Sequence, residues 1–321
     1  MNQYQRQRFE EALLNKIRNN DPTLTSLDLF HNQIGVEGTI HLAEALTINT
    51  TLISLDLSWN QIGDEGTIHL AEALKINSTL TSLNLYHNQI GVEGAIHLAE
   101  ALKINSTLIS LNMSSNQIGV EGTIHLAEAL KINSTLTSLD LYHNQIGVKE
   151  TIHLAEVLKI NSTLISLNLY HNQIGDEGAI HLAEALKINS TLASLNLSGN
   201  QIGVEGTIHL AEALKINSTL ISLDLSINRI THFPMDWCFI NTALKELDLR
   251  NNSIRSPPQH VCDHLPNEKP LNLMKYIEDL RRGASRPACV KAMILGHGGA
   301  GKTTLKNRVL LGKSCLSTGW I

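Results

Sequence analysis

The chain has 321 residues, of which 42% are hydrophobic and 17% charged, and its formal net charge at pH 7 is -5. This composition indicates a globular protein, and the repeated part of the chain lacks the stripe of lysine and arginine that a nucleic-acid-binding surface needs. The N-terminal residues lack the apolar core of a signal peptide and no run approaches the roughly 18 apolar residues of a membrane span, so we expect a cytoplasmic protein with no membrane or nucleic-acid partner.

The first predicted element is a helix at the N-terminus. Four apolar residues recur at helical spacing within a charged segment, namely Phe9, Leu13, Leu14 and Ile17. Asp21 and Pro22 follow, and proline cannot continue a helix. The pattern predicts a helix over residues 4–20, and we assign residues 1–23 as an N-terminal capping helix.

A repeated pattern occupies most of the chain. The series Leu-x-x-Leu-x-Leu-x-x-Asn-x-Ile begins at Leu24, recurs every 28 residues up to Leu220, and appears once more at Leu244 after 24 residues. Leu83 and Leu85 alternate with polar residues, which predicts a short strand with one buried face. We expect Asn88, after the strand, to bond to the backbone of the neighbouring unit, because no sheet ladder reaches those groups.

The second half of each unit is predicted to be a helix. Residues 92–103 have helical spacing, and their apolar face is formed by Leu98, Ala101 and Leu102. Glu93 in the first turn and Lys103 in the last turn suit the helix dipole. Gly94 is expected to allow the helix to approach a strand closely.

No single unit can bury its own leucines, so the units must stack into a solenoid with parallel strands inside the curve and helices outside. Residues 24–230 resemble the ribonuclease-inhibitor class of leucine-rich repeats. The resemblance implies an α/β fold, a horseshoe-shaped solenoid of 28-residue strand-helix units. Such solenoids bind partners on their concave strand face.

Aromatic residues interrupt the otherwise monotonous strand face. They stand at or beside the last strand position, and they are Phe30, Trp59, Tyr86, Tyr142 and Tyr170. Aromatic side chains supply contact area at low entropic cost, so a line of them predicts a strip that binds a protein partner. The alternative is that copied repeats simply carry copied residues, and the sequence leaves both open.

Seven histidines recur in register, at His41, His69, His97, His125, His153, His181 and His209. A metal site is not expected there, because neighbouring helices lie roughly 8–10 Å apart whereas zinc holds its nitrogen ligands at about 2.1 Å.

The recurring Asn-Ser-Thr, as at Asn77 and Asn133, matches the glycosylation sequon, but without a secretory signal we predict a turn role. The four cysteines show no C-x-x-C spacing and are expected to be reduced thiols.

The pattern changes after residue 230. Phe233 and Pro234 interrupt it, and the unit from Leu244 is shorter and resembles the typical class of leucine-rich repeat. We assign residues 231–265 as a shorter C-terminal repeat and cap. Residues 266–288 are predicted to form a linker helix.

A phosphate-binding loop follows. Residues 290–295 are predicted to form a buried strand and Thr304 begins a helix, so the glycine-rich segment between them has the strand-loop-helix context that phosphate binding needs. The expected cofactor-binding residues are Gly296, Gly298, Gly299, Gly301, Lys302, Thr303 and Thr304. Backbone N–H groups would face the phosphates, Lys302 would neutralise their charge, and the Thr303 hydroxyl would reach Mg²⁺. Residues 244–321 hold thirteen lysines and arginines against six acidic residues, which suits an anionic ligand.

The order of repeats, short helix and glycine-rich loop resembles the Roco family, whose members carry a Roc GTPase domain and then a COR dimerisation domain. The resemblance implies GTP or GDP and Mg²⁺ as cofactors of a full-length parent. The family's switch and guanine-reading motifs would lie beyond Thr304, and none occurs in the residues that remain. We therefore expect residues 289–321 to be an incomplete Roc-like domain in a piece of a longer protein, with guanine nucleotide bound weakly or not at all and no catalysis by this chain alone.

Two functions stay open at this point. The first is the protein-interaction module of a Roco-like signalling GTPase. The alternative is a stand-alone leucine-rich-repeat scaffold or inhibitor with no nucleotide function. A GTPase activator on the same repeats would need a catalytic constellation, and the sequence offers none.

Overall fold

The computed structural model describes residues 3–234 and 241–254, with side chains from Glu11 onward. The chain divides into two compact units, Met1–Lys269 and Pro270–Ile321, and every described residue belongs to the first. The end of the predicted C-terminal cap, the linker helix and the phosphate-binding loop lie outside the described residues.

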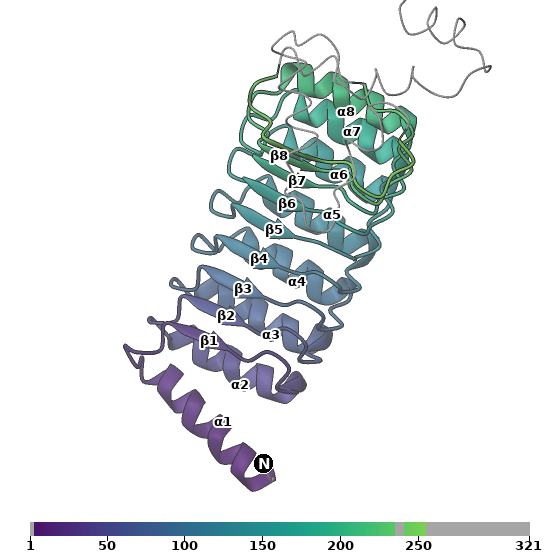
Figure 1. Ribbon diagram of the computed structural model, residues 1–321. Coiled ribbons are helices and arrows are strands. Elements are labelled where there is room, and N and C mark those ends of the chain that lie inside the picture. Colours follow the sequence, from purple (N-terminus) through teal and green to yellow (C-terminus); the bar gives the residue numbers. More distant parts are fainter. Residues whose placement is uncertain (1–2, 235–240, 255–321) are drawn as a thin grey trace, which may run out of the picture. The chain divides into compact units, whose positions relative to one another are not determined.

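Strands and helices alternate along the described chain (Figure 1). After α1 (Gln3–Arg18) the strands are β1 (Ser26–Asp28), β2 (Ser54–Asp56), β3 (Ser82–Asn84), β4 (Ser110–Asn112), β5 (Ser138–Asp140), β6 (Ser166–Asn168), β7 (Ser194–Asn196), β8 (Ser222–Asp224) and β9 (Glu246–Asp248). The helices between them are α2 (Gly35–Ile48), α3 (Gly63–Ile76), α4 (Val92–Leu102), α5 (Gly119–Leu130), α6 (Val148–Leu158), α7 (Gly175–Leu186) and α8 (Val204–Ile216). We name each repeat unit after its strand.

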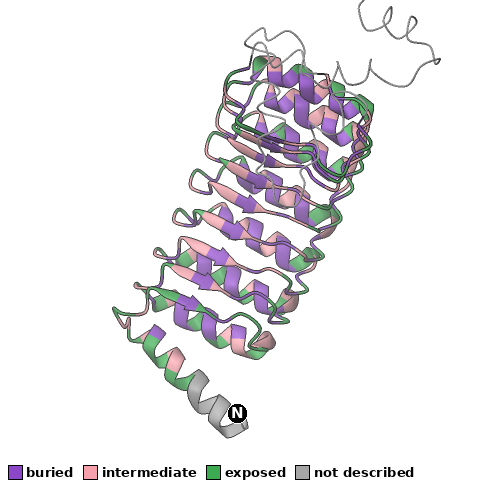
Figure 2. Ribbon diagram, in the orientation of Figure 1, coloured by how far each residue is buried: buried purple, intermediate pink, exposed green. Residues whose placement is uncertain are grey.

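The strands form one parallel sheet in sequential order from β1 to β9. Because successive units have the same length, equivalent residues pair, so that Leu111 lies opposite Leu83 on one side and Leu139 on the other. The helices cover one face of the sheet, and the buried residues lie between the two layers (Figure 2). The predicted α/β solenoid is therefore confirmed for the described residues.

The helix prediction is confirmed in detail, with one correction. Leu98, Ala101 and Leu102 form the buried face of α4. Gly94, however, allows close approach to helix α3 rather than to a strand, because a Cβ at this position would lie 2.7 Å from Asp64 Oδ1. The same Asp64 oxygen accepts hydrogen bonds from Gly91 N at 2.7 Å and from Gly94 N at 2.8 Å. One unit thus caps the positive end of the next helix.

Two columns of buried asparagines join the units. In the predicted column, Asn88 Nδ2 donates to Leu57 O of the preceding unit at 2.9 Å, and its Oδ1 accepts from Asn60 N at 2.9 Å. The equivalent amide reaches back to the preceding unit at Asn60, Asn88, Asn116, Asn144, Asn172, Asn200, Asn228 and Asn252. These side chains satisfy backbone groups that the short strands leave unpaired, which confirms the prediction made for Asn88.

The sequon asparagines form the second column. Asn133 Nδ2 donates to Leu102 O at 2.8 Å, and its Oδ1 accepts from Leu136 N at 2.8 Å. Its side chain is buried, as is that of Asn77. The turn role is therefore confirmed, and in the folded unit the amide is not accessible for glycosylation.

The two ends of the described sheet differ. At the N-terminal end α1 covers the first unit, with Ile17 fully buried and its carbonyl accepting a hydrogen bond of 2.7 Å from Asn49 Nδ2. At the other end β9 pairs with β8 in the same register, Leu247 opposite Leu223, although these two leucines are 24 residues apart in the chain and not 28. Helix α1 begins and ends within two residues of the helix predicted over residues 4–20.

Candidate interaction surface on the strand face

The aromatic residues were predicted at or beside the last strand position, and the structure places them in the turns two or three residues after it. Strand β1 ends at Asp28, whose Oδ1 accepts a hydrogen bond from Phe30 N at 2.9 Å. In β3 the corresponding bond runs from Tyr86 N to Asn84 Oδ1 at 3.0 Å. The next residue then adopts a left-handed conformation, with φ of 55° at His87. The polar side chain that ends each strand therefore starts a turn, and the turn presents the aromatic side chain.

The aromatic side chains form two clusters rather than one line. The first aromatic cluster consists of Phe30, His31, Trp59, Tyr86 and His87. Its centre is Trp59, which stacks on His87 with ring centroids 3.8 Å apart and meets Tyr86 edge-on at 6.0 Å. Phe30 and Trp59 are 55% and 38% exposed, which is unusual for side chains of this size.

The second aromatic cluster consists of Tyr142, His143, Tyr170 and His171. The two tyrosine rings are nearly parallel, with centroids 4.7 Å apart and an interplanar angle of 9°. Burial raises the pKa of the Tyr142 hydroxyl, and the neighbouring Tyr170 adds to this effect, so Tyr142 is a neutral hydrogen-bonding group near pH 7. The β4 unit carries Ser114 and Ser115 at the equivalent positions and separates the two clusters.

The histidines of the second cluster form a pair that the sequence pattern did not predict. The Nδ1 atoms of His143 and His171 lie 2.9 Å apart and share a hydrogen bond. One ring must donate and the other accept, so the two rings take different roles in this hydrogen bond. The sequence does place a histidine at the same position of two successive units. It does not specify the side-chain orientation that brings the two Nδ1 atoms together.

Charge on this surface has one sign. We define the strand face as the outward side chains of the strands together with the residue before each strand and the turn residues that carry the two clusters. Over β1 to β8 it includes Asp28, Asp56, Asp140 and Asp224 and neither lysine nor arginine. Among the described residues no salt bridge compensates these carboxylates. Asp140 Oδ2, for example, accepts a hydrogen bond of 3.0 Å from the uncharged Asn168.

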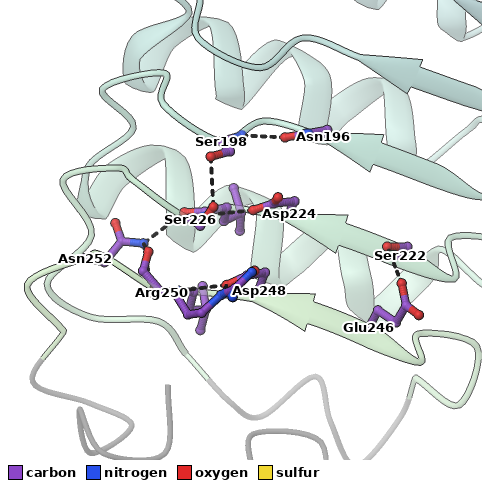
Figure 3. A network of polar contacts seen from close by, with 11 residues as sticks. Asn196, Ser198, Ser222, Asp224, Ser226, Glu246, Asp248, Arg250 and Asn252 are labelled. Atoms are coloured by element: carbon purple, nitrogen blue, oxygen red, sulfur yellow. Dashed lines mark hydrogen bonds and ion pairs between the residues drawn. The ribbon is translucent and has the colours of Figure 1, made fainter. Parts of the chain in front are cut away.

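The end of the face around β8 and β9 is polar and well connected (Figure 3). Asp248 forms an ion pair with Arg250, and the hydroxyls of Ser198 and Ser226 lie 2.8 Å apart. Burial raises the pKa of Asp224, while the hydrogen bond to Asp248 raises the pKa of Arg250. Each group is satisfied by a neighbour, so we interpret this network as structural rather than as a binding site.

On the helix face, the described residues form no alternative binding centre. Two of the in-register histidines lie beside a single carboxylate, since His41 Nδ1 is 3.7 Å from Glu44 Oε2 and His125 Nδ1 is 3.8 Å from Glu100 Oε1. Within residues 3–234 and 241–254, no group of three or more His, Cys, Asp or Glu side chains is placed to hold a metal ion. In the same ranges no helix has both the length and the apolar character that a bilayer requires.

Comparison with protein families identifies the repeats. A family model described as leucine-rich repeat matches residues 20–43, 49–71, 77–99, 105–127, 133–149, 161–183 and 189–211, and a second model with the same description matches residues 218–275. Together these segments span more than half of the chain. The chain is a leucine-rich-repeat protein. Neither model is a Roc GTPase domain, so the matches support the repeat part of the sequence resemblance and favour the alternative of a repeat scaffold.

Several solved structures are similar to this leucine-rich-repeat protein. Leiomodin-1 Actin-Binding Site 2 is 30% identical, with a TM-score of 0.42, and the match covers 46% of this chain and 86% of that one. The tropomodulin C-terminal domain of Caenorhabditis elegans is 17% identical, with a TM-score of 0.42 and coverages of 47% and 92%. The leucine-rich-repeat-containing protein LegL7 from Legionella pneumophila is 19% identical, with a TM-score of 0.49 and coverages of 82% and 92%. A search of curated protein sequences finds no match.

Proposed function

We propose that this leucine-rich-repeat protein is a protein-interaction scaffold, and that its strand face binds a partner through the two aromatic clusters. The observation that carries the proposal is that the fold does not need these aromatic residues. Serine stands in the place of Tyr86 in the β2, β4, β7 and β8 units. Ser58 N there donates to Asp56 Oδ1 at 2.8 Å, just as Tyr86 N donates to Asn84.

This comparison argues against the alternative that the aromatic residues are merely copied with the repeat. Units with serine and units with tyrosine have the same turn, so aromatic side chains at five positions on an exposed surface are not explained by backbone geometry. Exposed aromatic residues in a cluster are typical anchors of protein interfaces. The charged groups around the two aromatic clusters indicate which partner chemistry this face would bind.

The surroundings favour a cationic partner segment. The face carries carboxylates without compensating lysines or arginines over eight units, and the rings beside them present π surfaces. Arginine and lysine interact with both, by ion pairing and by cation–π contact. We therefore expect a preferred partner segment that contains arginine or lysine next to apolar residues.

The test replaces Tyr142 and Tyr170 with serine, the residue that other units carry at this position. Peptides selected by display on the intact chain are expected to be rich in arginine or lysine, and the double variant is expected to bind them roughly tenfold or more weakly, because two anchors are lost. Calorimetric titration gives both affinities. The matched control is Val120→Ser, which changes a 47% exposed residue on α5 and is expected to leave the affinity unaltered. Equal affinities for the double variant and the wild type would refute the proposal.

A second candidate function rests on the glycine-rich loop of residues 296–304, which lies outside the described residues. We propose that Lys302 and Thr303 contribute to a phosphate and Mg²⁺ site, as the sequence motif predicts. The expected result is weak, Mg²⁺-dependent binding of a fluorescent GTP analogue that the Lys302→Ala variant loses, with no turnover. Identical titrations of both proteins would leave the repeat scaffold as the whole function, and hydrolysis that Lys302→Ala abolishes would contradict the expected lack of catalysis.

A further inference from the structure

A row of exposed isoleucines runs along the edge of the solenoid where each helix leads into the next strand. The isoleucine row consists of Ile48, Ile76, Ile104, Ile132, Ile160, Ile188 and Ile216. Each member is between 56% and 65% exposed. An isolated exposed isoleucine is ordinary, but one in every unit from β1 to β7 forms a continuous feature.

The backbone holds the members of the row in the same pose. Ile104 N, Ile132 N and Ile188 N each donate a hydrogen bond of 3.0 Å to the carbonyl three residues earlier. The residue that follows each isoleucine is a buried asparagine tied to the preceding unit, as Asn133 is to Leu102 O. The spacing of the row is therefore set by the stacking of the units.

The surroundings of the row are electrically neutral. The lysine before the isoleucine pairs with the glutamate three residues earlier on the helix, so that Lys103 Nζ lies 2.6 Å from Glu100 Oε1. The same pair recurs in six units. On the other side stand uncharged residues such as Ser106 and Thr107. A surface of this kind does not suit an anionic membrane or a nucleic acid, which both need excess positive charge.

We propose that the isoleucine row is the interface with a second copy of this chain, and that the two rows run antiparallel across a two-fold axis. A partner must present apolar side chains at the same repeat spacing to lie opposite each of the seven isoleucines. A second copy does so necessarily, and two neutral flanks meet without repulsion.

The number of residues along the row is sufficient for an interface with a second copy. A stable interface buries roughly 800 Å² per partner and involves roughly 20–30 residues a side. Each of the seven units offers the isoleucine, the residue before it and the two hydroxyl residues that follow the buried asparagine. Together these residues reach the number that such an interface involves on each side. The strand-to-helix turns that carry the aromatic clusters are at the opposite ends of the parallel strands, so dimerisation leaves them open.

The first experiment measures the mass of the intact chain by analytical ultracentrifugation. At a chain concentration of about 100 µM the wild type is expected to sediment as a dimer, and on dilution the dimer is expected to dissociate. The triple variant Ile104→Glu, Ile132→Glu and Ile160→Glu is expected to be a monomer with the same circular dichroism, because the replaced side chains are mostly exposed. The matched control places the same charges on exposed valines at the other end of the helices, as Val92→Glu, Val120→Glu and Val204→Glu, and is expected to remain dimeric.

The second experiment tests the antiparallel arrangement, in chains whose four native cysteines are replaced with serine. Ile132 is the central member of the row, so the Ile132→Cys chain is expected to form a disulfide with its own copy under mild oxidation. Ile48→Cys is expected to cross-link to Ile216→Cys chains but not to itself.

Four outcomes would overturn the inference. These are a monomeric wild type at every concentration, a dimeric triple variant, a monomeric control, and self-linking of Ile48→Cys. The peptide affinity of the strand face is expected to be retained in the triple variant, so failure here is distinguishable from failure of the proposed function.

Discussion

Replacing Asn172 with alanine is expected to lower the free energy of unfolding by about 3–5 kcal/mol, because several buried backbone groups lose their partner at once. Asn172 Oδ1 accepts hydrogen bonds from Asn144 N at 3.0 Å and from Ile146 N at 2.9 Å. Its Nδ2 donates to Leu141 O of the preceding unit at 3.1 Å. Alanine can replace none of these bonds, and the site is too deep for bulk water to do so.

Urea unfolding followed by circular dichroism measures this loss. The matched control is Gln173→Ala, an exposed side chain next in sequence, which is expected to change stability by less than about 0.5 kcal/mol. Since each unit contacts only its neighbours, a weakened link between the β5 and β6 units is also expected to broaden the unfolding transition. A loss below about 1 kcal/mol for Asn172→Ala would show that the asparagine column does not hold the units together.

The second large effect is expected at a core leucine. Leu139 is 1% exposed in β5 and lies in register between Leu111 and Leu167. The Leu139→Ala variant removes apolar contacts and leaves a cavity between three units, so we expect a loss of about 2.7–5 kcal/mol in the free energy of unfolding. The neighbouring strands are too tightly packed for the cavity to close.

The matched control for this variant is Val120→Ala, which truncates a 47% exposed side chain on α5 and is expected to change stability by less than about 0.5 kcal/mol. The same urea titration measures both variants. Similar losses for the two would contradict the assignment of the leucine columns as the core of the solenoid.

The periodic part of the fold could be predicted because the spacing of apolar residues within each unit specifies its strand and its helix. The alternation at Leu83 and Leu85 and the helical face at Leu98 and Leu102 are local patterns, and the structure confirms both. The inter-unit role of Asn88 was also predictable, since short parallel strands leave backbone groups that only a repeated side chain can satisfy.

The candidate interaction surface was predicted only in part. The five aromatic residues were predicted because they interrupt an otherwise monotonous strand face, but they were placed at or beside the last strand position and in one line. Their true place depends on where each strand ends, and Asn84 ends its strand through a side-chain bond to Tyr86 N. The isoleucine row was not predicted, because an isoleucine at or just after the end of a helix can be either buried or exposed, and the sequence pattern does not say which.

By itself the sequence determined the repeat length, the alternation of strand and helix, the parallel stacking and the presence of a glycine-rich loop, since each of these follows from spacing along the chain. Only the tertiary structure decided that the aromatic rings gather in two clusters, that His143 meets His171, and that seven isoleucines remain in contact with solvent. The physical reason is that these relations join residues of different units. Their distances depend on how one unit lies upon the next, which spacing within a unit does not specify.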